Sequence, residues 1–513
     1  AWGGTQLLPK LVGPETAIKV IVSNPLRQNR MLAAADVAQL GIADRLLEPA
    51  EFVDDSLAFA RELAERPLER PEPDWSAEET LFRRARTNVD DIVHGAAPAP
   101  YVALDLIAGA REWTLEEGYA HEEEAIGGLL PGPQAQASIY AFSLVEQRAK
   151  RHPARPTADP KKVSKVGIVG AGLMARQIAT LFLRRLEVPI AIRDVKQEIV
   201  DDALADIRAE IDRQVAKGRY DEGKGRFLSS LVSGGADYDG FVDCDLVLEA
   251  VFEELGVKQQ VFAELEQVVK DDCVLATNTS ALSITDMAAD LRRPERVAGM
   301  HFFNPVALMP LLEVVRAAET DAVTLATVWD AGEKLRKRPI LVNDAPGFVV
   351  NRVLTRMTRV IMDAIEHGTP VEEVDEAVMS LGMPMAPSVL LQMVGPRVAN
   401  HVLERMHDAF PERFPLSPGL AALADGADPV VVEHAPRTRD EIVEDVLEAV
   451  ADEIHLLLEE GVVAEAADVD TGLLLGAGWP FFLGGATKHL DQIGMSERLF
   501  GHTFADMRAG AAL

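Results

Sequence analysis

Six short apolar runs alternate with stretches of helical periodicity in the middle of the chain, and no other feature limits the possible folds as strongly. The runs read KVGIVG, PIAIRD, DLVLEAV, CVLATN, RVAGMHF and PILVN. Strands that alternate with helices form parallel sheets, because the crossover helices cover both faces of the sheet. The pattern therefore predicts a doubly wound α/β domain over residues 163–345. A polar insertion at about residues 196–236 carries two helical patterns, and we expect it to form a helical hairpin beside the sheet.

The part of the chain before this domain has a helical pattern. Residues 1–150 hold a Gly-Gly turn, several stretches with apolar residues at helical spacing and a proline-rich break. Residues 151–162 are basic, contain three prolines and lack apolar periodicity. We interpret them as a linker between the first helical part and the α/β domain.

An internal duplication is expected after the last apolar run. Two segments share a helix end, a glycine, a Val-Asp pair and a Gly-x-Pro sequence in the same order. The matching positions are Gly368 with Gly461, Asp375 with Asp470, and Pro384 with Pro480. The pattern predicts two all-helical repeats, residues 346–430 and 431–513, each using glycine to end a helix.

Composition excludes several classes of function. The net charge of −31 argues against a general nucleic-acid or anionic-membrane surface, because both need basic patches. Two cysteines, Cys244 and Cys273, provide neither a disulfide framework nor a metal-ligand motif, and no stretch is long and apolar enough to cross a bilayer. We therefore expect a cytoplasmic protein with two reduced, partly buried thiols, no metal site and no transmembrane segment.

The strongest local motif is a strand, a glycine-rich turn, a helix and a second strand, KVGIVGAGLMARQIATLFLRRLEVPIAIRD. Gly170 permits the tight turn, Gly172 lets the backbone approach a pyrophosphate, and Ala175 allows close helix–strand packing. Asp194 ends the second strand, where it can accept hydrogen bonds from a ribose diol and repel a 2′-phosphate. The motif predicts a Rossmann-type site that prefers NAD to NADP. Arg176 is either a pyrophosphate contact or a solvated surface residue.

A second set of polar residues is expected at the carboxyl edge of the sheet, where ligands bind in doubly wound folds. His301 ends an apolar run, and Glu313 lies twelve residues later on the next element. A histidine paired with a carboxylate is a competent general base near neutral pH, because the carboxylate fixes the tautomer and stabilises the imidazolium. Ser280 and Asn351 supply uncharged donors for a substrate oxygen. Each residue alone has a structural explanation, but their grouping beside a nucleotide site favours catalysis.

The motifs VGAGLM, VLEAVFEE, NTSALSI, GMHFFNPV and DAPGFVVNRVL resemble those of the L-3-hydroxyacyl-CoA dehydrogenases. This resemblance implies the NAD-dependent oxidation of a 3-hydroxyacyl-CoA to a 3-ketoacyl-CoA. It implies that His301 is the catalytic base, that Glu313 is its partner, and that the reacting oxygens are polarised by Ser280 and Asn351. The residues that it places along the NAD site are Gly170, Gly172, Leu173, Met174, Asp194, Glu253, Lys258 and Asn278. The polar hairpin would help to cover the acyl-CoA.

The whole chain resembles the α-subunit of the multifunctional fatty-acid β-oxidation complex. The stretches AWGGTQLLPKLVG and AADVAQLGIADRLLEP are similar to the second half of an enoyl-CoA hydratase, or crotonase, domain. In that family the catalytic glutamates and the oxyanion-hole donors precede the Gly-Gly-Thr turn. The resemblance therefore predicts that this chain dehydrogenates without hydrating, and that a longer parent protein also has hydratase (lyase) activity. It also implies a thiolase β-subunit as a partner, while Glu444, at the place of Asn351 in the second repeat, indicates a structural repeat.

Three alternatives stay open at this point. The chain could retain the full multifunctional activity, act as an NAD-binding scaffold for a thiolase, or be another NAD oxidoreductase with a helical C-terminal domain, such as a 6-phosphogluconate-type enzyme. The complete set of His, Glu, Ser and Asn residues argues against the scaffold, and the HFFNP segment argues against the third alternative. Acyl-chain preference and oligomeric state are not predicted.

Overall fold

The computed structural model describes residues 2–27, 31–66 and 68–507. It divides the chain into two compact units, Ala1–Gln136 with Met379–Pro384, and Ala137–Val378 with Met385–Leu513. Residues 1, 28–30, 67 and 508–513, which belong to the predicted first and last domains, lie outside the described residues. The bounds predicted for the linker, the α/β domain and the helical repeats stay predictions.

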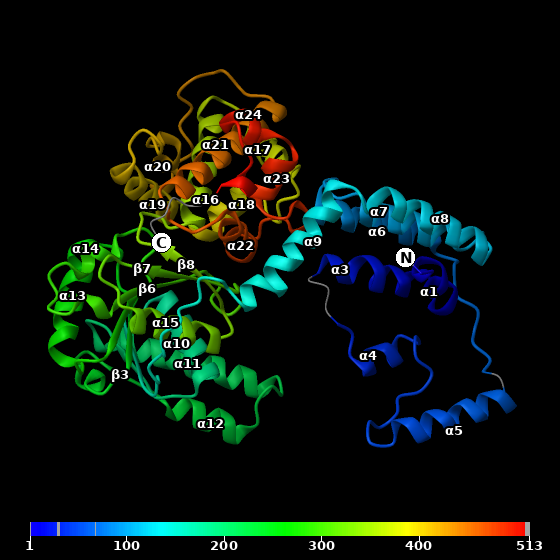
Figure 1. The fold of residues 1–513 in the computed structure, drawn as a ribbon, viewed down its shortest axis with the longest axis horizontal. Coiled ribbons are helices and arrows are strands. Elements are labelled where there is room, and N and C mark those ends of the chain that lie inside the picture. Colours follow the sequence, from blue (N-terminus) through cyan, green and yellow to red (C-terminus); the bar gives the residue numbers. More distant parts are fainter. Residues whose placement is uncertain (1, 28–30, 67, 508–513) are drawn as a thin grey trace. The chain divides into compact units, whose positions relative to one another are not determined.

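The larger unit contains the predicted α/β sheet (Figure 1). Its eight strands lie in the order β3-β2-β1-β4-β5-β6-β7-β8. All six apolar runs form strands, and their side chains are largely buried, as a sheet with both faces covered requires. The strands are β1 Val166–Val169, β2 Ile190–Arg193, β3 Val232–Gly235, β4 Leu246–Glu249, β5 Val274–Thr277, β6 Val297–Phe302, β7 Leu311–Arg316 and β8 Arg338–Asn343.

Two strands, β3 and β7, are not among the six that the sequence predicts. The short edge strand β3 lies inside the polar insertion and has two exposed residues, so no apolar run marks it. Strand β7 runs antiparallel to β6, whereas the other neighbouring strands are parallel. Only residues 303–310 connect β6 to β7, and a parallel crossover needs about a dozen residues or more. The prediction of a wholly parallel sheet is therefore wrong at this one pair.

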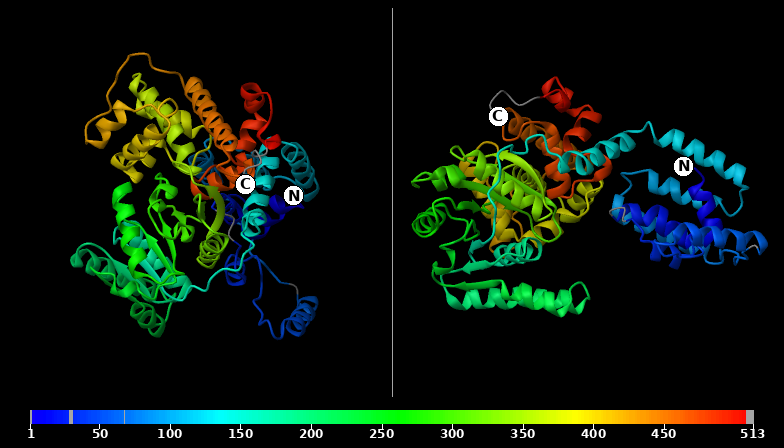
Figure 2. Two further views of the ribbon diagram at one scale, coloured as in Figure 1. Left: turned by 60° about the vertical axis from the view of Figure 1, so that its left-hand side comes forward. Right: turned by 60° about the horizontal axis from the view of Figure 1, so that its bottom comes forward.

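Six α-helices belong to this α/β region: α10 Leu173–Leu186, α11 Gln197–Ala216, α12 Glu222–Ser230, α13 Leu255–Val268, α14 Ile284–Ala288 and α15 Ala322–Lys334. Side chains of α10, α11, α12 and α15 form one hydrophobic core with the sheet, and α13 and α14 lie outside that cluster. Phe182 of α10 and Trp329 of α15 are among the largest buried side chains of this core. Helices α11 and α12 form the predicted hairpin, which extends from the sheet in both views of Figure 2.

After β8 the described residues of the larger unit contain only helices and loops. The helices are α16 Val350–Glu366, α17 Val371–Met379, α18 Pro387–Val394, α19 Pro396–Ala409, α20 Pro418–Ala424, α21 Arg439–Glu459, α22 Ala466–Gly476, α23 Ala486–Gln492 and α24 Met495–Phe500. The two long helices, α16 and α21, pack against each other. A buried ion pair joins them, because the Arg352 guanidinium lies 2.5 Å from the Glu453 carboxylate.

The two halves of this helical region share a local design. In both halves a long helix ends at a glycine with positive φ, 88° at Gly368 and 66° at Gly461. The aspartate of the next helix then accepts hydrogen bonds from the backbone N–H and the hydroxyl of one residue near the start of a later helix. That residue is Ser388 for Asp375 and Thr487 for Asp470. The repeated hydrogen bonds support the duplication that the sequence predicts.

The described part of the smaller unit is helical. Its α-helices are α1 Gly4–Val12, α2 Pro14–Ile18, α3 Asn24–Leu26, α4 Ala34–Gln39, α5 Phe52–Glu65, α6 Glu78–Val93, α7 Ala99–Gly109 and α8 Leu115–Leu129, with a π-helical turn at Lys19–Ser23. In the Gly-Gly-Thr turn Gly3 is the N-cap of α1, and Gly4 and Thr5 are the first residues of the helix. Thr5 donates to the buried Glu122 carboxylate of α8 through its backbone N–H at 2.9 Å and its hydroxyl at 2.7 Å. The turn is therefore tied to a helix more than a hundred residues away.

Both cysteines are free and buried. Burial raises the pKa of the Cys244 and Cys273 thiols to about 12, so neither is a ready nucleophile. Among the described helices, none has the length and apolar character needed to cross a membrane.

Candidate active site

The glycine-rich turn lies between β1 and α10, with its conformation set by the backbone. Gly170 has a φ of 104°, and a Cβ there would lie 2.5 Å from the Ala250 carbonyl oxygen, so only glycine fits. A Cβ on Gly172 would meet no atom within 4 Å. Gly172 is also the N-cap of α10, whose first N–H groups and dipole favour an anion. The turn thus leaves open space at a helix N-terminus, which fits a pyrophosphate.

Asp194 follows β2 and lies beside the same turn. Its carboxylate accepts hydrogen bonds from the backbone N–H groups of Ala171 at 2.8 Å and Val195 at 2.7 Å. The carboxylate is half-buried and is held next to the glycine turn, where it can meet a ribose. Arg176 donates to the Ala171 carbonyl oxygen at 2.8 Å and pairs with Asp206, so its guanidinium already has protein partners.

Leu173 and Met174 form the first turn of α10. Leu173 is 66% exposed, whereas Met174 is half-buried against the core of the sheet. A dinucleotide bound at the open glycine turn would cover this exposed apolar side chain. The residues present therefore fit a dinucleotide.

His301 and Glu313 face each other across β6 and β7. They are directly opposite in the antiparallel register, and His301 Nδ1 lies 2.6 Å from Glu313 Oε2. Both residues are buried, with exposed fractions of 4% and 0%. The sequence did not predict the antiparallel strand β7. Its pairing with β6 brings two residues that are twelve positions apart into a hydrogen-bonded pair.

The start of α16 holds the Glu313 carboxylate. Glu313 Oε1 accepts hydrogen bonds from the backbone N–H groups of Val349 at 3.2 Å and Val350 at 3.1 Å. An ionised carboxylate only accepts hydrogen bonds, so the bond between Glu313 and His301 requires a proton on His301 Nδ1. His301 Nε2 is then left to accept a proton. The rings of Phe303 and Phe348 lie 4.5 and 5.5 Å from the His301 ring, centroid to centroid, and wall it with apolar surface.

Ser280, Asn351 and Asn278 lie at the same edge of the sheet. Asn351, in the first turn of α16, donates from Nδ2 to the Ser280 carbonyl oxygen at 3.0 Å. Asn278 follows β5 and accepts from the backbone N–H of Phe302 at 2.8 Å, next to His301. Helix α16 thus joins the two halves of the centre, since it holds Glu313 through its backbone and Ser280 through Asn351.

Lys258 is a fully buried cation, and two carboxylates hold it. Its Nζ lies 2.8 and 2.9 Å from the two carboxylate oxygens of Glu249 and 3.2 Å from Glu253. Burial would raise the pKa of the Glu253 carboxyl, but the Lys258 charge and hydrogen bonds from Thr279 and Ser280 outweigh burial and hold that pKa below its usual range. Lys258 therefore positions Glu253, and Glu253 in turn accepts from the Ser280 backbone N–H at 2.7 Å.

Three residues at this centre were not predicted from the sequence. Glu249 neutralises Lys258, Thr279 donates to Glu253 Oε1 at 2.6 Å, and Phe348 lies against His301. Glu249 and Glu253 both stand in the VLEAVFEE motif, so the motif was a signal for the first. Thr279 and Phe348 likewise stand in the motifs NTSALSI and DAPGFVVNRVL, but their partners Glu253 and His301 are distant in the sequence, so the motifs do not show these contacts.

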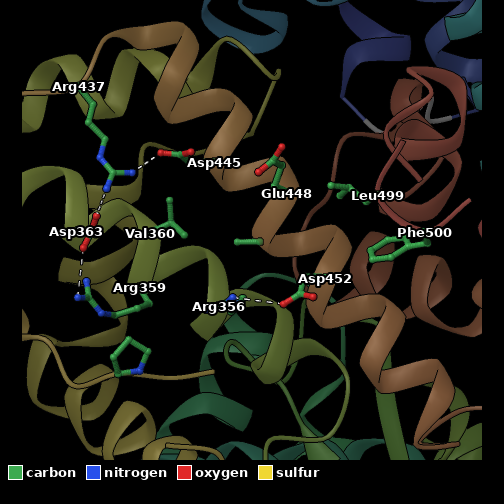
Figure 3. Close-up of a pocket in the computed structure, with 12 residues that line it drawn as sticks. Arg356, Arg359, Val360, Asp363, Arg437, Asp445, Glu448, Asp452, Leu499 and Phe500 are labelled. Atoms are coloured by element: carbon green, nitrogen blue, oxygen red, sulfur yellow. Dashed lines mark hydrogen bonds and ion pairs between the residues drawn. The ribbon is translucent and has the colours of Figure 1, made fainter. Parts of the chain in front are cut away.

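The helical region contains two hollows of different character. One, of about 570 Å³, lies between α16 and α21 and is lined mainly by charged side chains (Figure 3). Its charges are largely paired: Arg437 bridges Asp363 and Asp445, and Arg356 lies 3.4 Å from Asp452. The other hollow, of about 360 Å³, is mostly apolar, and Asn351 is one of the residues that line it.

Comparison with known proteins identifies relatives for the larger unit. Residues 165–345 match the NAD-binding domain of 3-hydroxyacyl-CoA dehydrogenases, and residues 347–425 match the C-terminal domain of the same enzymes. Together these matches span half of the chain.

Solved structures of similar proteins cover half of the chain or more. (S)-3-hydroxybutyryl-CoA dehydrogenase PaaH1 from Ralstonia eutropha is 32% identical over 52% of this chain and 95% of its own, with a TM-score of 0.49. FadB2 of M. tuberculosis is 34% identical over 52% and 95%, also with a TM-score of 0.49. The 3-hydroxybutyryl-CoA dehydrogenase of Escherichia coli K12 is 23% identical over 68% and 97%, and its TM-score of 0.58 indicates a shared fold.

Proposed function

Because the chain belongs to the 3-hydroxyacyl-CoA dehydrogenase family and uses NAD, we propose that His301 is the base that takes the proton from the 3-hydroxyl group of its substrate. The observation that carries this proposal is the buried pair of His301 and Glu313, held by the start of α16. A histidine whose Nδ1 is fixed by a carboxylate presents Nε2 as a proton acceptor.

Each further step of the proposed reaction has its own group. NAD⁺, when bound at the glycine turn, supplies the acceptor for the hydride that leaves C3 of the substrate. His301 receives the hydroxyl proton at Nε2, and Glu313 stabilises the imidazolium that results. Ser280 and Asn351 orient the reacting oxygen, and the phenyl rings of Phe303 and Phe348 keep water from the imidazole. The product is a 3-ketoacyl-CoA.

The test compares His301→Ala with the wild-type chain. We expect kcat for the oxidation of 3-hydroxybutyryl-CoA, followed by NADH absorbance, to fall by about 10²- to 10⁴-fold, which is the usual contribution of a general base. NAD affinity, measured by calorimetric titration, should change little, because His301 is not at the glycine turn. His434→Ala is the matched control, since that histidine is exposed and far along the chain. Near-normal turnover by the His301 variant would refute the assignment.

We also propose a place for the enzyme in fatty-acid β-oxidation, as the dehydrogenase part of a multifunctional α-subunit in the cytoplasm. Support comes from the second helical repeat and from the helical smaller unit, whose Gly-Gly-Thr turn resembles a crotonase domain. Hydration of 2-enoyl-CoA is proposed only for a polypeptide that also carries the crotonase half preceding that turn. A thiolase β-subunit is the proposed partner, and co-elution of the two chains in size-exclusion chromatography tests it.

A further inference from the structure

The apolar hollow in the first helical repeat has no role in the reaction described above. It occupies about 360 Å³ between α16, α18, α19 and α20, and most of its lining is aliphatic. Protein interiors are close-packed, and an engineered apolar cavity of about 150 Å³ is already large enough to bind benzene. The hollow has more than twice that volume and reaches the buried cluster around Met362, Leu403 and Leu420.

Several polar groups on its wall have protein partners, although the buried Nε of Arg359 has no hydrogen-bond partner among the described residues. The Asp375 carboxylate accepts from the Ser388 N–H and hydroxyl, the Thr358 hydroxyl donates to the Leu354 carbonyl oxygen, and Arg359 lies 3.2 Å from Glu366. Because these groups already have partners, a ligand in the hollow needs to make few hydrogen bonds to the wall. The hollow therefore favours an apolar occupant over a polar or charged one. The charged cleft of Figure 3 has the opposite character.

One end of the hollow meets the reacting centre. Asn351 lines the hollow and also donates to the Ser280 carbonyl oxygen. The lining continues along α16 from Asn351 to Ile365, and fourteen residues of α-helix span about 21 Å. An extended chain of tetrahedral carbons advances about 1.2 Å per bond, judged from the length of an extended peptide. A substrate held at Asn351 therefore has room for an alkyl tail of more than ten bonds.

We propose that this hollow binds the alkyl tail of the acyl group, so that the enzyme prefers medium- and long-chain 3-hydroxyacyl-CoA to 3-hydroxybutyryl-CoA. The proposal rests on the proposed function of His301, because it takes Asn351 as the point where the reacting carbons lie. Ala399, half-buried in α19, is a small residue on the wall of the hollow, and a larger side chain there fills the space of the tail.

The test measures kcat/KM for 3-hydroxybutyryl-CoA and 3-hydroxydodecanoyl-CoA with the full chain and saturating NAD. We expect the longer substrate to be favoured by at least about tenfold. That factor equals about 1.4 kcal/mol, less than the burial of two methylene groups gives. Ala399→Phe should lower this preference at least tenfold. Ala409→Phe makes the same change at an exposed position of the same helix, outside the hollow, and should leave the preference unaltered.

A second measurement does not depend on the folding of a variant. Dodecanoyl-CoA, which lacks the reacting hydroxyl, should inhibit the wild-type enzyme at concentrations at least tenfold lower than butyryl-CoA. Equal rates and equal inhibition across chain lengths would overturn the acyl-tail proposal and leave the dehydrogenase itself intact. Absence of NADH formation with every chain length would instead overturn the proposed function of the centre.

Discussion

Asp470 offers a quantitative test of how burial controls a charge in this protein. The residue lies in α22 and is fully buried. Its carboxylate accepts from the Thr487 N–H at 2.8 Å, from the Thr487 hydroxyl and from the Tyr140 hydroxyl at 3.1 Å. Burial raises the pKa of the Asp470 carboxyl from 3.8 to about 7, although these hydrogen bonds act in the opposite direction. The charged form is therefore disfavoured in the folded chain.

The sign of the pH effect follows from proton binding. Below pH 4 the carboxyl is protonated in the folded and in the unfolded chain, so it does not change the free energy of unfolding. Between pH 4 and 7 only the folded chain keeps the proton, so the free energy of unfolding falls as the pH rises. A pKa difference of about three units corresponds to about 4 kcal/mol in the free energy of unfolding. The folded chain loses this amount of stability between pH 4 and pH 7. Asp470→Asn removes this dependence while keeping an oxygen for the Thr487 N–H.

The assay compares urea unfolding of the Asp470→Asn variant and the wild type from pH 5 to pH 8. We expect the stability of the variant relative to the wild type to increase by about 3 kcal/mol over this range and to become constant above pH 7. Asp375→Asn is the matched control, because Asp375 has equivalent partners in the first repeat but is only half-buried. A difference between variant and wild type that stays within about 1 kcal/mol at every pH would refute the reasoning.

Two further predictions concern the reacting centre and the nucleotide site. Glu313→Gln should keep the fold, lower kcat by at least about tenfold and shift the pH profile of turnover, because the imidazolium loses its carboxylate partner; an unchanged profile would contradict the pairing. Gly170→Ala should weaken NAD binding about tenfold and lower the melting temperature, since a positive φ costs a side chain about 1–2 kcal/mol and the Cβ meets the Ala250 carbonyl oxygen. Gly172→Ala should weaken NAD binding alone, and a matching loss of thermal stability there would argue against an open pyrophosphate site.

Prediction from the sequence succeeded where the signal was local. The alternation of strands and helices, the Gly170 turn and the hairpin after Asp194 depend on residues close together in the chain, so periodicity and spacing reveal them. Prediction failed where a partner came from far away or a signal was weak. β3 carries too few apolar residues to be seen, and β7 was not among the six predicted strands; it runs antiparallel to β6, as its short connection requires.

The sequence by itself determined the α/β domain, the two helical repeats and the types of residue available for catalysis. Only the tertiary structure decided how those residues act. The antiparallel register places Glu313 opposite His301, and the start of α16 fixes the carboxylate. Packing also encloses Lys258 between two carboxylates and leaves an apolar hollow beside Asn351. Burial, desolvation and cavity space arise from many distant segments at once, so they exist only after the chain has folded.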